Sequence, residues 1–355
     1  MTVSAHPLTH EERHARFVLE LLADPAGQGS PALDTPDWPL LARLAQRHAV
    51  LIRVADRLAD LGVPLPRDFV ASAERERERS RATLDVLRHV QANSIRHRVA
   101  WMAPKVPQRY PDVGDDLDLM VFTPDLGVDR LLLDGIPVTR ERPSLANRLS
   151  GSTVYTVVGA IAPGLVIDIH HGRVGPAGQH VAFARALPSG AQRQVLGREG
   201  GGPELCVPAP EDQLVLQGLE KVAGRRSFHL CDVLQTVAIL RRTRLDWDRV
   251  VTTARAHGGW DGLSCYLYYV DEAYARLVGW QLLTPEQRHT LTLRGWGHAS
   301  LHETGFRFPA LRVTGRLHGS QLGRSLGQAQ WNTALRLSLW PFAVVGTRLA
   351  QARTW

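Results

Sequence analysis

Long hydrophobic runs, paired cysteines and lysines are all scarce in this 355-residue sequence. No run approaches the roughly 18 apolar residues of a transmembrane helix, and the first residues do not resemble a secretory signal. Cys206, Cys231 and Cys265 are far apart and odd in number, and no CxxC pair occurs. This usage argues against a disulfide framework and against a cysteine-based metal site. We therefore expect a cytoplasmic protein with no membrane span.

The net charge of the chain is concentrated at its C-terminal end. No Asp or Glu follows Glu303, whereas seven arginines do: Arg307, Arg312, Arg316, Arg324, Arg336, Arg348 and Arg353. They account for the whole net charge of +7, so residues 1–303 are neutral overall. Such a segment can attract nucleotide phosphates, nucleic acid or lipid head groups, and it is equally consistent with a solvated basic face.

Hydrophobic periodicity and capping signals divide the chain into helical ends and a β-rich middle. Helices are predicted over residues 9–22, 40–62, 67–97, 210–222, 228–241, 246–256, 261–279 and 327–350, with another beginning at Thr284. Strands are predicted over 99–103, 117–122, 153–158 and 165–169, and more weakly over 181–185 and 205–208.

These elements predict an α+β (mixed α/β) fold with three parts. Residues 1–97 form an N-terminal helical region, and residues 98–208 form an α/β core around a small sheet. Residues 209–355 form a C-terminal helical domain with the basic tail.

Two acids, Asp116 and Asp118, lie on the predicted strand that follows Gly114. Residues i and i+2 of a strand point to the same face, about 6.6 Å apart along the strand axis. Two neighbouring carboxylates repel each other, and a divalent cation between them removes that conflict. Mg²⁺ binds through one or two carboxylates together with waters and substrate phosphates. The pair is therefore a candidate metal site.

An Asp-x-Asp spacing is weak evidence by itself, because Asp246 and Asp248 share it where they open a predicted helix. There they are best explained as helix-capping and dipole-complementing residues. Asp116 and Asp118 differ because they lie on an apolar strand. A third acid, Asp168, lies on a second apolar strand, where a carboxylate is costly unless it is paired or bound to a metal.

The segment Tyr110-Pro-Asp-Val-Gly-Asp-Asp-Leu-Asp-Leu-Met-Val121 resembles the core motif of the uncharacterised bacterial nucleotidyltransferase family, which belongs to the polymerase-beta-like superfamily. The segment Val166-Ile-Asp-Ile-His-His171 resembles the Asp-containing strand of the same family. Weaker similarity extends the resemblance over roughly residues 35–280. It implies a polymerase-beta-like sheet in which Asp116 and Asp118 hold the metals. It also implies that Asp168 is the third acid and activates the acceptor.

The chain departs from the superfamily where a Gly-Ser turn normally cradles the triphosphate. Gly114 and Asp115 lie too close to Asp116 to replace that turn, so phosphate binding by backbone N–H groups is in doubt. Lys105 is a candidate phosphate contact, although a lysine in a turn is the simpler explanation. Lys221 is a second candidate, and it also suits the end of a helix.

His170 shares a face with Asp168, whereas His171 must point to the opposite face. His170 is therefore the candidate for a contact with substrate or with a metal-binding residue. A structural histidine is the alternative.

The resemblance implies a transferase that binds Mg²⁺ or Mn²⁺ and an NTP, with ATP the expected nucleotide. It would transfer the nucleoside monophosphate to a hydroxyl or amine and release pyrophosphate. The acceptor is unknown, and a small molecule or protein ranks above RNA because the tail contains no RNA-binding signature. The alternatives are a degenerate scaffold with a binding or regulatory role and a toxin-like transferase that modifies tRNA.

Overall fold

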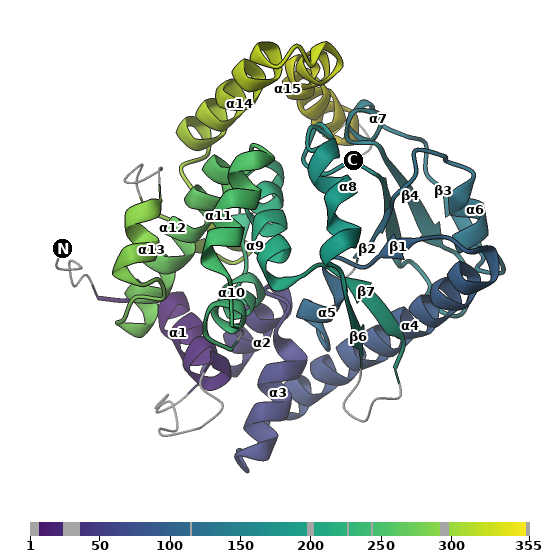
Figure 1. Ribbon diagram of the computed structural model, residues 1–355. Helices are drawn as coiled ribbons and strands as arrows, with labels where there is room; N and C mark the ends of the chain where they lie inside the picture. The colour runs from purple at the N-terminus through teal and green to yellow at the C-terminus, as the bar shows by residue number, and fades with distance from the viewer. Residues whose placement is uncertain are drawn as a thin grey trace.

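The computed structural model describes residues 7–23, 36–113, 116–196, 202–225, 227–242, 244–291 and 298–352. These residues form the α+β fold that the sequence predicts. A mixed sheet lies on one side of the molecule and a group of helices on the other (Figure 1). The long helix α4 (Arg67–His97) runs beneath the sheet and has the limits that its sequence pattern predicts.

The main sheet has five strands in the order β1-β2-β5-β4-β3. The strands are β1 (Trp101–Met102), β2 (Asp116–Val121), β3 (Val138–Arg140), β4 (Ser152–Val157) and β5 (Val166–His171). The central strands β2 and β5 run parallel, while every other pair is antiparallel. The core between the sheet and α4 includes Leu117 and Ile167 from the strands and Leu87 and Val90 from the helix. This packing leaves the opposite face of β2 and β5 directed towards the other helices.

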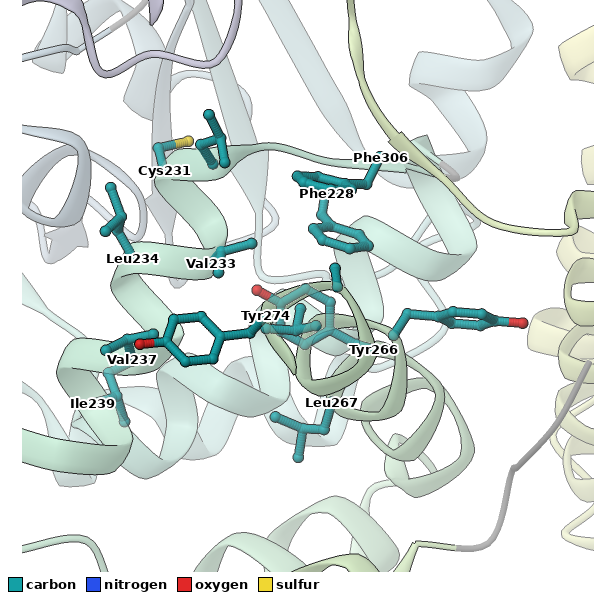
Figure 2. Close-up of a cluster of buried hydrophobic side chains, with 14 of the residues drawn as sticks. Phe228, Cys231, Val233, Leu234, Val237, Ile239, Tyr266, Leu267, Tyr274 and Phe306 are labelled. Atoms are coloured by element: carbon teal, nitrogen blue, oxygen red, sulfur yellow. The ribbon is translucent and has the colours of Figure 1, made fainter. Parts of the chain in front are cut away.

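The N-terminal and C-terminal helices share a second hydrophobic core, which also takes in Met102 and Met120 from the sheet. Within it the rings of Phe228 and Phe306 stack with their centroids 4.8 Å apart, above Tyr266 (Figure 2). The helices of this part are α1 (His10–Ala23), α2 (Trp38–Arg47), α3 (Leu51–Asp60), α9 (Pro210–Gly218), α10 (Leu230–Arg242), α11 (Trp247–Ala256), α12 (Trp260–Val278) and α13 (Pro285–Thr290).

Helix α9 continues directly into a π-helix, η1 (Leu219–Arg225). Gly218 lies where the two meet, and a Cβ atom there would come within 2.5 Å of the Leu263 backbone in α12. A side chain at this position would push the two helices apart, so glycine permits the close contact. The π-helix adds an extra residue per turn and changes the direction in which the following side chains point.

Three sequence-based expectations need correction. Residues 181–185 form the start of α8 (Val181–Gly190) rather than a strand. Phe183, Ala184 and Leu187 are buried there at helical spacing, which outweighs the weak strand signal. The helix predicted over 40–62 is split between α2 and α3, where Ala49 has a φ of 52°. The helix expected to end near Lys221 instead continues to Arg225 as η1.

Several short elements were not predicted. They are α5 (Val106–Arg109), α6 (Val128–Leu132), α7 (Leu145–Ser150), β6 (Gln192–Val195), β8 (Ser227–Phe228), β9 (Ser300–His302) and β10 (Gly305–Arg307). The strand predicted more weakly over 205–208 is confirmed as β7 (Glu204–Val207). The helix start at Thr284 is confirmed, since Thr284 and Gln287 form a capping box.

The basic tail forms α14 (Ala310–Gly327) and α15 (Trp331–Ala352). These helices lie at the top of Figure 1, and α15 packs against both α14 and α7. Among the described residues, no helix has the combined length and apolarity needed to cross a membrane.

Candidate functional site

The parallel pairing of β2 and β5 places Asp118 directly beside Asp168. Both lie on the face opposite Leu117 and Ile167, which pack into the core against α4. Side chains alternate along a strand, so the same local rule directs both carboxylates towards η1 and away from that core. Asp118 is only 4% exposed, which makes an uncompensated charge there costly.

His170 completes this arrangement, which we call the strand cluster: Asp118, Asp168 and His170. The Nε2 atom of His170 lies 3.5 Å from Asp118 Oδ1 and 3.6 Å from Asp168 Oδ2. One ligand atom from each of the three residues lies within 4.8 Å of the others, a separation compatible with one shared metal ion. The cluster therefore joins two of the three predicted acids with the predicted histidine.

Lys105, at the start of α5, reaches the strand cluster from the neighbouring loop. Its Nζ atom lies 2.7 Å from Asp118 Oδ2 and 2.8 Å from Oε1 of Glu220 in η1. Lys105 thus connects the sheet to the helical part through two carboxylates. Glu220 was not anticipated from the sequence, because its approach depends on the phase of a π-helix that apolar periodicity does not predict.

Asp116 lies on the same strand face but has a different partner. Its Oδ1 atom is 3.3 Å from Nη1 of Arg109, and its side chain is partly exposed. The ligand atoms that cluster within 4.8 Å belong to Asp118, Asp168 and His170. Of the predicted Asp116 and Asp118 pair, Asp118 is the member that lies within the cluster.

The pKa values of the strand cluster reflect competition between burial and neighbouring charges. Burial alone would raise the pKa of Asp118, but Lys105 and His170 hold it well below its usual range. Burial raises the pKa of Asp168; His170 opposes this rise, and the Asp118 carboxylate adds to it. Burial would lower the pKa of His170, but Asp168 and Asp118 raise it above its ordinary value. Each group therefore depends on the charge of the others.

The donor set of the strand cluster fits a divalent cation. Asp168 Oδ1 is buried and has no hydrogen-bond partner among the described residues. Such an atom is costly unless another group compensates it. Carboxylate oxygens suit Mg²⁺ and Mn²⁺, whereas the imidazole of His170 favours the transition-metal ion of the two.

His171 points to the opposite side of β5, as the alternation predicts. Its Nε2 atom lies 3.3 Å from Asp129 Oδ1 and 3.2 Å from Thr153 Oγ1. Asp129 also accepts a hydrogen bond from the Tyr155 hydroxyl at 3.0 Å. These contacts give His171 a structural role in the buried core, whereas His170 faces the two acids.

A second group, which we call the helix cluster, consists of Lys221, His229, Cys231 and Asp232. Lys221 Nζ lies 2.9 Å from Asp232 Oδ1, and both side chains are almost fully buried. Asp232 Oδ2 accepts the backbone N–H of His229 at 2.8 Å. Burial raises the pKa of Cys231 to about 11, with Asp232 adding to the rise, so the thiol form is favoured. Lys221, predicted as a phosphate contact, thus forms a buried ion pair.

A cavity of about 730 Å³ borders the helix cluster, where His229 and Cys231 line it, and it reaches Asp116 of β2. Its lining also includes Arg109, Glu76, Arg79 and Arg47. Charges of both signs therefore surround the space, which falls within the size range of small-molecule sites.

Asp246 belongs to the second Asp-x-Asp motif of the sequence. Its side chain accepts a hydrogen bond from the backbone N–H of Arg249 at the start of α11, which confirms its role as a helix cap. Gly114 and Asp115, where the phosphate turn is in question, lie outside the described residues. No family model, curated protein or solved structure matches this chain.

Proposed function

We propose that the protein is a metal-dependent nucleotidyltransferase. The proposal depends on one observation: Asp118 and Asp168 lie side by side on parallel strands, with His170 between them. Three ligating groups converge there, and Asp116, two residues before Asp118 on the same strand, lines a polar cavity. The resemblance of both strand segments to a nucleotidyltransferase family provides the reaction type.

Asp118 and Asp168 would hold a Mg²⁺ or Mn²⁺ ion, with His170 as a further ligand or as the group that orients them. When bound, such an ion polarises the phosphoryl oxygens and neutralises charge on the leaving pyrophosphate. The acceptor oxygen or nitrogen forms a bond to the α-phosphorus of ATP, and the bond to the β-phosphate oxygen breaks. Asp168 accepts the acceptor proton, a role suited to a carboxylate of raised pKa.

Lys105 and Arg109 are the cations nearest the acids and would bind the triphosphate in place of the Gly-Ser turn. Each contacts a carboxylate, at Asp118 and Asp116 respectively. A cation bound by Asp118 would compete with Lys105 for that oxygen, and the ammonium, which also lies 2.8 Å from Oε1 of Glu220, could then turn towards a phosphate. Repulsion between the bound metal ion and the Lys105 ammonium favours the movement of the ammonium away from Asp118.

The cavity beside Asp116 would receive the acceptor. The residues that line it include carboxylates and guanidinium groups, which suit a small hydrophilic molecule with hydroxyl, amino or carboxylate groups. This favours a small-molecule acceptor over RNA, consistent with the ranking made from the sequence.

The test is nucleotide binding and transfer by the whole chain with Mg²⁺ or Mn²⁺. Calorimetric titration is expected to show metal-dependent ATP binding, and α-labelled ATP is expected to label a supplied acceptor. Asp118→Asn and Asp168→Asn should each reduce transfer by at least about a hundredfold. Asp248→Asn, in the matched Asp-x-Asp motif of α11, should leave transfer unchanged. Full activity in either strand-cluster variant would refute the assignment.

One observation favours a second candidate, a binding or regulatory protein on a degenerate scaffold. The ammonium of Lys105 already lies 2.7 Å from Asp118, where it partly compensates the acid. In that case the titration would detect no metal-dependent ATP binding, and Asp168→Asn would leave the protein's ligand binding unaltered.

A further inference from the structure

Helix α15 has an exposed apolar face that contributes nothing to the core of this chain. Trp331 is 67% exposed, Leu335 60% and Phe342 73%, and Leu339 is also exposed. Their spacing of four, four and three residues places them within an arc of about 80° on a helix of 3.6 residues per turn. They therefore form one continuous stripe, which we call the α15 stripe.

The other side of α15 is anchored to the protein. Ala334, Leu337 and Ala343 are buried, and the helix packs on α14 and α7. The α15 stripe is consequently presented on a helix that is docked through its other residues (α15 is at the top of Figure 1). Exposed apolar stripes of this kind mark interaction sites more often than isolated exposed residues do.

The segment of the chain that contains the α15 stripe has charge of one sign. No acidic residue follows Glu303, and the tail contains seven arginines. Arg324 donates to the carbonyl oxygens of Arg255 and Ala256, and Arg336 donates to that of Gly178. These partners are neutral, so they hold the guanidinium groups without cancelling their charge.

Arg173 lies close to Arg336 and adds a second positive charge where α15 meets the rest of the protein. Burial lowers the pKa of Arg336, and repulsion from Arg173 lowers it further. An anionic partner would relieve this repulsion.

We propose that the α15 stripe binds the surface of an anionic lipid bilayer. Trp, Phe and Leu on one helix face with arginines nearby are the features of helices that lie in the membrane interface. The negative potential of such a surface acts over about a Debye length, so the arginines of both tail helices contribute without direct contact. A second copy of this chain would bring two positively charged tails together. RNA would engage the arginines but leave Leu335 and Leu339 exposed.

The test is cosedimentation of the full chain with vesicles of phosphatidylcholine, alone or with about one-third phosphatidylglycerol. The protein should sediment with the anionic vesicles and much less with the neutral ones. Raising salt from about 0.05 M to about 0.5 M should weaken binding, because screening shortens the Debye length.

The double variant Leu335→Ser/Phe342→Ser should reduce binding to anionic vesicles by at least about tenfold, because it removes the apolar part of the contact. The matched control is Ile95→Ser, an equally exposed apolar residue on α4, and it should bind like the wild type. Circular dichroism of both variants checks that the fold is retained. No binding to anionic vesicles, or equal binding by the double variant, would overturn the proposal. So would sedimentation velocity that shows a dimer which the double variant abolishes.

Discussion

The strand cluster and the helix cluster both bring together side chains that can bind a metal, yet their charge balance differs. In the helix cluster, one carboxylate, Asp232, is matched by the buried ammonium of Lys221 and by the imidazole of His229, 3.5 Å away. In the strand cluster, the carboxyl groups of Asp118 and Asp168, together with that of Glu220, share the single ammonium of Lys105 and the imidazole of His170.

The two clusters also differ in how completely their carboxylate oxygens are paired. Asp232 uses one oxygen for Lys221 and the other for a backbone N–H, so its bonding capacity is filled. Asp168 retains a buried oxygen without a partner among the described residues. Both clusters bring potential ligands together, but only the strand cluster combines them with an excess of buried carboxyl groups, and the proposed metal site depends on that excess.

The largest expected effect on stability comes from breaking the ion pair of the helix cluster. Asp232→Ala should lower the free energy of unfolding by about 3–5 kcal/mol, because Lys221 is left buried without its counter-ion. Asp168→Asn should change stability little or raise it in the absence of metal, because it removes repulsion with Asp118. Urea denaturation of both variants measures the contrast. A larger loss for Asp168→Asn than for Asp232→Ala would contradict this account.

Acid should destabilise the protein next to the helix cluster, because the ring of His48 contacts that of His229. Burial, and then repulsion from His229, lowers the pKa of His48 to about 3, with Asp232 opposing the shift. The unfolded chain binds the proton near pH 6.5, so it holds more protons than the folded chain between about pH 6.5 and 3. Stability should therefore fall as the pH drops through this window.

The loss over this window should be on the order of 5 kcal/mol, at 1.36 kcal/mol per pKa unit. Unfolding free energies measured across the window test it, with His48→Gln as the comparison because it cannot titrate. If the variant retains the full slope, other groups account for the acid sensitivity.

Metal ions should stabilise the protein through the strand cluster alone. At about 100 times its dissociation constant, Mn²⁺ should add about 2.7 kcal/mol to the free energy of unfolding. Asp168→Asn should remove this gain. Cys231→Ser, which alters the helix cluster, should retain it, because Lys221 already neutralises that cluster. Thermal unfolding with and without Mn²⁺ measures the gain in both variants. If both variants lose the Mn²⁺ stabilisation equally, the strand cluster is not a separate metal site.

The smallest effects concern the glycine next to η1. Gly218→Ala should lower stability by about 1–3 kcal/mol, because its methyl group would meet the Leu263 backbone and displace the π-helix. The control is Gly319→Ala on α14, where a Cβ atom meets open space. It should raise stability by roughly 0.5–1 kcal/mol through helix propensity. Denaturation curves should move in opposite directions, and parallel shifts would contradict the packing argument.

Local rules predicted a substantial part of this structure. The long, highly charged pattern of residues 67–97 predicted the whole of α4, and the capping signal at Thr284 located α13. The weak strand at 181–185 was wrong because alanines and apolar residues at helical spacing favour α8. The π-helix was missed because no recognisable sequence signal marks it. Its extra residue per turn changes the spacing at which apolar residues fall on one face of the helix.

The sequence by itself determined that the acids of β2 and β5 would face one side of the sheet, and that His170 rather than His171 would join them. Strand alternation is a local property of the backbone, so it needs no knowledge of distant segments. Only the tertiary structure decided the partners. Adjacent residues Glu220 and Lys221 reach different clusters because the phase and docking of η1 direct them apart. Pairing across the fold depends on how helices pack, and composition and spacing do not encode that geometry.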